Sequence, residues 1–149
     1  MLWLIEEWHR AEKTGCQLEA TQLKTAQAIE RWAALVAIVA IRLLQLRNLA
    51  QAAAGQTPDA PAAPANQPAA LQAMVPRTWL LMVAGPAKRA PETLTPRVFW
   101  LTIAKQGGFL GRKGDGKPGW MTIWRGWYDV MLMVHGAERL AAAPPKSCG

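Results

Sequence analysis

Glu6, near the start of the chain, is a candidate ligand for a metal ion. Because Mg²⁺ is held by several oxygen ligands, a single carboxylate on an exposed helix binds it poorly. The aspartates lie elsewhere, at Asp59, Asp115 and Asp129, and none is placed to join Glu6. Taken by its type and position alone, Glu6 is a solvated helical carboxylate.

The histidines and tryptophans carry weaker signals. His9 could serve as a base or a metal ligand, but one histidine on a helix is more often structural. His135 has even fewer candidate catalytic or metal-binding residues around it in the sequence. Eight tryptophans are many for 149 residues. Those in the last predicted helix could stack on nucleic-acid bases. Their regular helical spacing favours core packing or a subunit interface instead.

A glycine-rich basic loop, residues 108–119, contains the candidate phosphate contacts. Its segment GRKGDGK has the GxxxxGK spacing of a phosphate-binding P-loop, and GDGKPG matches GxGxxG. Both motifs require a preceding strand, whereas a helix is predicted here, so we take neither as functional. Two interpretations remain open. Arg112, Lys113 and Lys117 contact a DNA phosphate backbone, or they belong to a solvated turn.

Helices are expected to position these residues. Apolar periodicity predicts helices over 2–13 and 23–49, and the second is apolar nearly all round in its middle, which is typical of a buried helix. Its two polar ends should emerge into solvent. The ten-residue apolar run at its centre is too short for a bilayer, which needs roughly 20 apolar residues, so we predict no membrane span.

The second half of the chain is predicted to form a small helical domain. Residues 51–74 are Ala/Pro-rich and are expected to be a linker between a first domain, 1–50, and a second, 75–149. Helices are predicted over 77–84, about 96–106 and about 120–141. Thr95 can cap the middle one, and Leu94 can pack against Phe99 as a hydrophobic staple.

The last predicted helix carries an apolar stripe that two short helices would cover poorly. The stripe consists of Trp120, Trp124, Trp127, Met131 and Val134. Gly126, inside this helix, is tolerable where another backbone approaches closely. A second copy of the helix could supply that backbone and form a self-complementary dimer. The alternative is that the stripe lies entirely within the core of one chain.

Charge and cysteine content narrow the class of protein. The formal net charge is +7, and residues 77–149 account for all of it, which favours polyanionic partners such as nucleic acid. The two cysteines, Cys16 and Cys148, have no CxxC spacing, which argues against a disulfide framework or a zinc site and fits a reducing cytosol.

The N-terminal segment IEEWHRAEKTG, residues 5–15, resembles the I-E-E-x-H-x-x-x-K-T-G signature of the Tn-five-type bacterial DDE transposases, in the insertion-sequence-four superfamily. The resemblance maps Glu6 onto the last carboxylate of the Asp-Asp-Glu triad. It maps Lys13 onto a lysine associated with transposon-end DNA, and Trp3 onto the tryptophan before the helix. Segments 36–49 and 99–127 also look like parts of this family.

This resemblance implies a fold and a cofactor. It implies a mainly α chain, formed by the C-terminal helical tail of an RNase H-like catalytic domain and a small helical C-terminal domain for dimerisation and DNA contact. It also implies Mg²⁺ as the cofactor. Two departures stand out, because Leu2 occupies a position where the family has Arg, and the family's Tyr would precede Met1. The two catalytic aspartates are not found in this sequence.

We therefore expect a C-terminal fragment of a cut-and-paste transposase that is inactive alone. The alternative is a non-enzymatic DNA-binding or regulatory module that pairs with a full-length transposase. The implied partners are transposon-end DNA and either a second copy of this chain or the full-length enzyme. The implied location is the bacterial cytoplasm, associated with the nucleoid.

Overall fold

A computed structural model describes residues 2–11, 13, 22–52 and 66–142. Each regular element within these ranges is helical, which confirms the mainly α fold class. The expected RNase H-like character of the first part stays a prediction. Asp59, Cys16 and Cys148 lie outside the described residues. The elements are α1 (Leu2–Arg10), α2 (Ala26–Ala52), α3 (Pro68–Gln72), α4 (Arg77–Ala87), the 3-10 turn η4 (Pro91–Thr93), α5 (Pro96–Gln106) and α6 (Trp120–Ala142).

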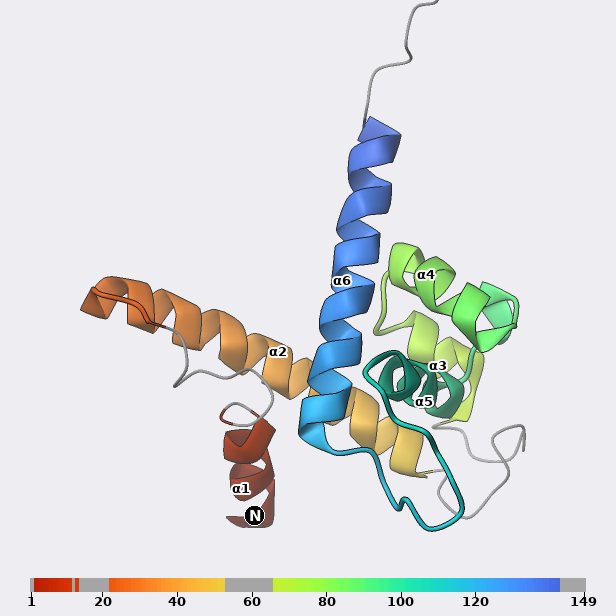
Figure 1. Cartoon of the computed structure of the whole chain (residues 1–149), viewed down its shortest axis with the longest axis horizontal. Helices are drawn as coiled ribbons and strands as arrows, with labels where there is room; N and C mark the ends of the chain where they lie inside the picture. Colours follow the sequence, from red (N-terminus) through yellow and green to blue (C-terminus); the bar gives the residue numbers. More distant parts are fainter. Residues whose placement is uncertain (1, 12, 14–21, 53–65, 143–149) are drawn as a thin grey trace, which may run out of the picture.

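Two long helices, α2 and α6, set the overall shape. Figure 1 shows α3, α4 and α5 gathered on one side of α6, while one end of α2 and one end of α6 project beyond them. Helix α5 packs against α2, α4 and α6. The hydrophobic core lies among these four helices and includes the fully buried side chains of Leu43, Phe99, Ile103, Ile123 and Val130.

Helix α5 begins as its sequence predicts. The Thr95 hydroxyl accepts a hydrogen bond from the Val98 backbone N–H at 3.3 Å, which satisfies one of the free donors of the first turn. Leu94 and Phe99 are both completely buried in the core, as expected of a staple pair. The side-chain carbonyl of Asn66 accepts a further bond from the Arg97 N–H at 3.2 Å.

The crossing of α5 and α6 depends on two glycines. A Cβ atom at Gly126 would overlap the carbonyl oxygen of Ile103 and lie 2.9 Å from the Gly107 nitrogen. A Cβ at Gly107 would likewise overlap the carbonyl oxygen of Thr122. Of the two alternatives for Gly126, the close backbone approach is therefore made by α5 of the same chain, and Gly126 gives no support to a dimer.

The expected boundary at residues 51–74 differs from the structure. Helix α2 continues to Ala52, and α3 begins at Pro68 within the range expected to be a linker. Leu71 in α3 is completely buried in the core, where α3 packs against α5. Residues 53–65 lie outside the described part of the chain. The core also joins Leu43 of α2 to α5 and α6, so the described parts of 1–50 and 75–149 share one core.

The burial of α2 matches the prediction at its polar N-terminal end, which is exposed, and reverses it in the middle and at the C-terminal end. Its C-terminal half, expected to emerge into solvent, buries Leu43, Leu44, Leu46 and Ala50. Its middle and N-terminal half expose Ile29, Leu35, Ile38 and Ile41, so the apolar centre is not surrounded by neighbours. By length and composition α2 is the one helix of the described residues that could cross a membrane, a test that the core helix of a soluble protein also passes.

Candidate carboxylate cluster and nucleic-acid interface

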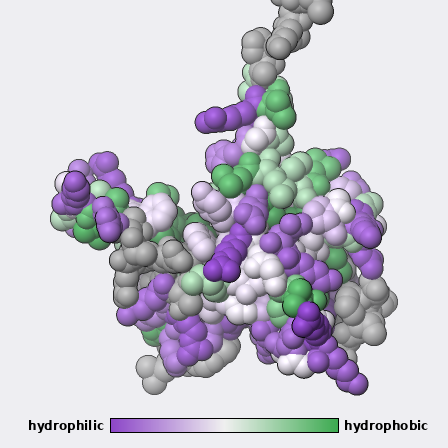
Figure 2. Space-filling view, viewed as in Figure 1, coloured by the Kyte–Doolittle hydropathy of each residue, from purple (hydrophilic) through white to green (hydrophobic). Residues whose placement is uncertain are grey.

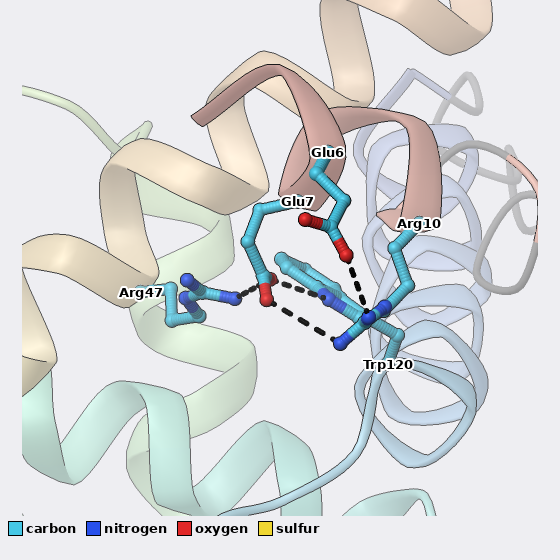
Figure 3. A network of polar contacts seen from close by, with 5 residues as sticks. All are labelled: Glu6, Glu7, Arg10, Arg47 and Trp120. Carbon is cyan, nitrogen blue, oxygen red and sulfur yellow. Dashed lines mark hydrogen bonds and ion pairs between the residues drawn. The ribbon is translucent and has the colours of Figure 1, made fainter. Parts of the chain in front are cut away.

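The two glutamates of α1 point in different directions. The Glu6 side chain is 69% exposed and forms an ion pair with Arg10, one helical turn away, at 3.2 Å between Nη2 and Oε1. Glu7 is only 13% exposed and points toward α2 and α6 (Figure 3). Adjacent residues on a helix diverge by about 100°, which is why one carboxylate meets solvent while its neighbour is enclosed.

Glu7 is the centre of a polar network. Its Oε2 atom accepts hydrogen bonds from Arg47 of α2 and from the indole Nε1 of Trp120, the latter at 3.3 Å. Arg10 approaches its Oε1 atom at 3.6 Å. The hydrogen bond from Arg47 is the main reason that the pKa of Glu7 lies below its ordinary value, and the positive charges of Arg47 and Arg10 act in the same direction against desolvation.

Trp120 and Arg47 also contact each other. The Arg47 guanidinium carbon lies 5.1 Å from the centre of the Trp120 ring, within the range of a cation–π interaction. Trp100 packs edge-on against the other side of this arrangement, with ring centres 6.2 Å apart and planes at 87° to Trp120. Sequence analysis did not identify Glu7 or Arg47. The local pattern around each residue could not indicate their contact, because it joins positions 40 residues apart.

The residues around Glu6 do not fit a magnesium ion. No group of three or more His, Cys, Asp or Glu side chains among the described residues could hold a metal. The neighbouring carboxylate, Glu7, is already bound to two arginines, and Arg10 neutralises Glu6 itself. A divalent ion would have to displace these cations for one or two oxygen ligands, whereas Mg²⁺ requires near-octahedral coordination.

The basic loop between α5 and α6 has a defined turn. The Asp115 carboxylate accepts a hydrogen bond from the Arg112 backbone N–H at 2.7 Å, and the Asp115 N–H donates to the Arg112 carbonyl at 3.0 Å. Gly111, Gly114 and Gly116 all have positive φ, which glycine adopts without strain. The element before this loop is a helix, α5, so neither phosphate-binding motif has the strand that it requires.

This turn presents its cations to solvent. Arg112, Lys113 and Lys117 are all exposed. Lys117 also lines a cavity of about 370 Å³ together with Glu7, Arg47 and Trp120, so the loop and the polar network meet at the start of α6. Lys13, the other predicted DNA contact, is exposed just beyond α1.

The tryptophan stripe of α6 packs mostly within the chain. Trp127 lies against Trp79 of α4, with ring centres 4.3 Å apart, and Trp120 meets Trp100 of α5. Both are only partly buried, while Ile123, Gly126, Val130 and Val134 form the face of α6 that is fully enclosed. The structure thus assigns much of the stripe to the border of the core.

A different apolar face of α6 points outward. We call it the outer face, and it comprises Met121, Tyr128 and Leu132, which recur at helical spacing. Tyr128 is 47% exposed and Leu132 is 52% exposed. Figure 2 shows hydrophobic and hydrophilic atoms side by side over the upper part of α6. Exposed large apolar side chains that recur on one side of a helix are typical of an interaction site.

Residues 77–144 match the family model described as the transposase Tn5 dimerisation domain. The match contains α4, α5, the basic loop and α6, including the outer face, and it leaves out α1 and α2. It supports the relation of this chain to Tn5-type transposases and to a dimerising protein. The match does not include Glu6, so the role of this carboxylate is not tested by it.

Proposed function

We propose that this chain is the dimerising, DNA-contacting part of a cut-and-paste transposase, with Glu6 as the last carboxylate of the catalytic triad. The observation that carries the proposal is the coincidence of the Tn5 dimerisation-domain match with the exposed outer face of α6. In this proposal the first helix is the end of an RNase H-like catalytic domain, and the protein works in the bacterial cytoplasm on transposon ends.

The dimer would form through the outer face. Two copies of α6 can pair about a two-fold axis, because Tyr128 and Leu132 of one copy then meet the same residues of the other. Figure 1 shows α3, α4 and α5 on one side of α6, so a partner helix can approach from the opposite side without clashing with them. Burying these side chains removes apolar area from water, at about 25 cal/mol per Å².

The DNA contact would use the basic loop. Residues 77–149 hold all of the net positive charge, and Arg112, Lys113 and Lys117 are exposed cations on one turn. Lysines and arginines that neutralise phosphates release bound counterions, so such binding is weakly sequence-dependent and falls steeply with salt. Lys13 would add a contact beside α1, as the family resemblance implies.

Catalysis by this chain alone is not part of the proposal. Mg²⁺ is the expected cofactor of the complete triad, and Glu6 would be one of its ligands when the two aspartates are supplied. The described residues do not assemble that site. Incubation with supercoiled DNA and Mg²⁺ should therefore give no nicking, and cleavage that disappears in Glu6→Gln would contradict this expectation.

Sedimentation of the full chain tests the dimer. We expect a dimer at micromolar concentration for the wild type and a monomer for Leu132→Glu, because a charge in the paired apolar face is left desolvated. Leu110→Glu is the matched control, since Leu110 is also exposed, at 63% against 52% for Leu132, but lies in the loop before α6. A wild-type monomer, or a dimer that tolerates Leu132→Glu, would contradict the proposed interface.

A regulatory role is the second candidate. The described residues contain the whole outer face but do not complete a metal site, so the chain could pair with a full-length transposase and withhold the second active site. Mixing tagged full-length transposase with this chain should yield a mixed dimer that loses strand transfer. Leu132→Glu should restore strand transfer if the mixed dimer forms through α6.

A further inference from the structure

Glu7 joins three elements that are distant in the sequence. It lies on α1, its partner Arg47 lies near the C-terminus of α2, and its partner Trp120 is the first residue of α6, 113 positions away. Trp120 falls within the segment that matches the dimerisation domain, and α6 also carries the outer face. The network in Figure 3 is thus a direct physical link between α1 and the dimerisation helix.

We propose that Glu7 is a positioning residue, which holds α1 against the first turn of α6 and thereby sets the direction in which Glu6 points. The proposal rests on the proposed role of Glu6 as a triad carboxylate. Because neighbouring residues on a helix diverge by about 100°, fixing Glu7 inward requires Glu6 to face outward. Glu6 is in fact exposed, and Arg10 contacts both carboxylates from one turn further along α1.

The apolar contact of α1 with α2 is less directional than this polar network. Ile5 and Trp8 meet Ile41 and Leu44 of α2 around an apolar cavity of about 340 Å³, so this contact is loosely packed. Apolar contact is non-directional, and it permits a short helix to rotate about its axis or to slide. Charge-assisted hydrogen bonds are directional and short, so those to Glu7 select one rotation of α1.

The receiving side of the link is connected to the core. Trp120 packs at right angles to Trp100, a buried residue of α5, and contacts the guanidinium of Arg47. Arg47 is 12% exposed and follows Leu46, which is part of the core. A displacement of α6 relative to α5 would therefore be transmitted to Glu7, and through it to the helix that carries Glu6.

An NMR titration of the full ¹⁵N-labelled chain tests this link. The indole N–H signal of Trp120, identified by its absence in Trp120→Phe, should shift in one step as pH falls below the usual carboxylate range. The charged groups facing Glu7 are Arg47 on α2, Arg10 and Glu6 on α1, and Lys117 in the loop. Glu7→Gln should abolish the step, and Glu6→Gln, the matched control with an exposed carboxylate, should retain it.

Hydrogen exchange of α1 gives the second readout. In Glu7→Gln the amides of residues 5–10 should exchange about tenfold faster, the loss expected for one charged hydrogen bond, while α5 stays protected. Unchanged exchange in α1, or equal loosening of α1 and α5, would overturn the inference. If Glu7→Gln does not fold, acidification of the wild type gives the same test. If the chain is a monomer, the proposed dimer is wrong, but the expected pH-dependent shift of the Trp120 signal is unaffected. Failure of the proposed dimer and failure of the Glu7 inference are therefore distinguishable.

Discussion

The two long helices, α2 and α6, each pack with one half and project with the other, yet they do so for different reasons. Helix α6 buries its N-terminal half because Gly126 lets α5 approach within backbone contact. Helix α2 buries its C-terminal half through large side chains such as Leu43 and Leu46, and no glycine is involved. The comparison teaches that apolar content does not decide which half is covered, because both projecting halves are as apolar as the buried ones.

The exposed apolar residues of the two helices also differ in their relation to the family match. The outer face of α6 lies within the match to a dimerisation domain, and the proposed dimer would cover it. The exposed apolar residues of α2 lie outside that match, and they are Ile29, Leu35, Ile38 and Ile41. Variants that separate packed from projecting positions on each helix test this contrast directly.

The largest effect is expected at the α5–α6 crossing. Gly126→Ala places a methyl group against the backbone of Ile103, which cannot rotate away as a side chain could, so the helices must separate. We expect a loss of more than about 4 kcal/mol in the free energy of unfolding, measured by urea denaturation. Gly136→Ala on the same helix meets no atom within 4 Å and should stabilise the chain by about 1 kcal/mol. Equal effects of the two variants would show that the crossing is not tight.

A smaller effect should separate the two halves of α2. Leu43→Ala removes a fully buried side chain and should cost about 3 kcal/mol of unfolding free energy. Leu35→Ala removes a side chain that is 58% exposed and should change stability by less than about 0.5 kcal/mol. The same urea transition measures both. A large loss at Leu35 would mean that the projecting half of α2 is covered in solution.

The link between α1 and the two long helices should appear as a pH dependence. The folded-state pKa of Glu7 is lowered, so its contribution to stability is fully present above the unfolded-state value, about 4.3. The contribution is lost as pH falls through the lower folded-state pKa. Subtracting the stability profile of Glu7→Gln from that of the wild type should leave a difference that is constant near neutral pH and shrinks only in acid. A difference that shrinks near pH 6 would contradict the assignment.

The smallest expected effect concerns the basic loop beside α6. Replacing Arg112, Lys113 and Lys117 together by Ala should leave folding unchanged, because all three are exposed. The slope of the logarithm of DNA affinity against the logarithm of salt concentration should decrease by about one unit per lost phosphate contact. Fluorescence anisotropy with a labelled duplex measures it. If slope and affinity stay the same, the loop is a solvated turn.

Local rules predicted much of the chain correctly. The cap at Thr95, the staple of Leu94 with Phe99 and the end of α5 at Gly107 depend on neighbouring residues only, so the sequence contains all that is needed. The extents of α2 and α6 follow from apolar periodicity, and the predicted ends lie within a few residues of the observed ones. The likeness to a Tn5-type transposase was visible in residues 99–127, and the dimerisation-domain match supports it for that region.

What the sequence by itself determined was therefore the helical class, the helix positions, the basic loop and the family resemblance. The tertiary structure alone decided which faces were covered. It showed that Gly126 meets α5 rather than a second copy, that Leu71 belongs to the core rather than to a linker, and that Glu7 meets Trp120. The physical reason is that these contacts join residues far apart in the chain, and periodicity indicates that a face is apolar without indicating which neighbour covers it.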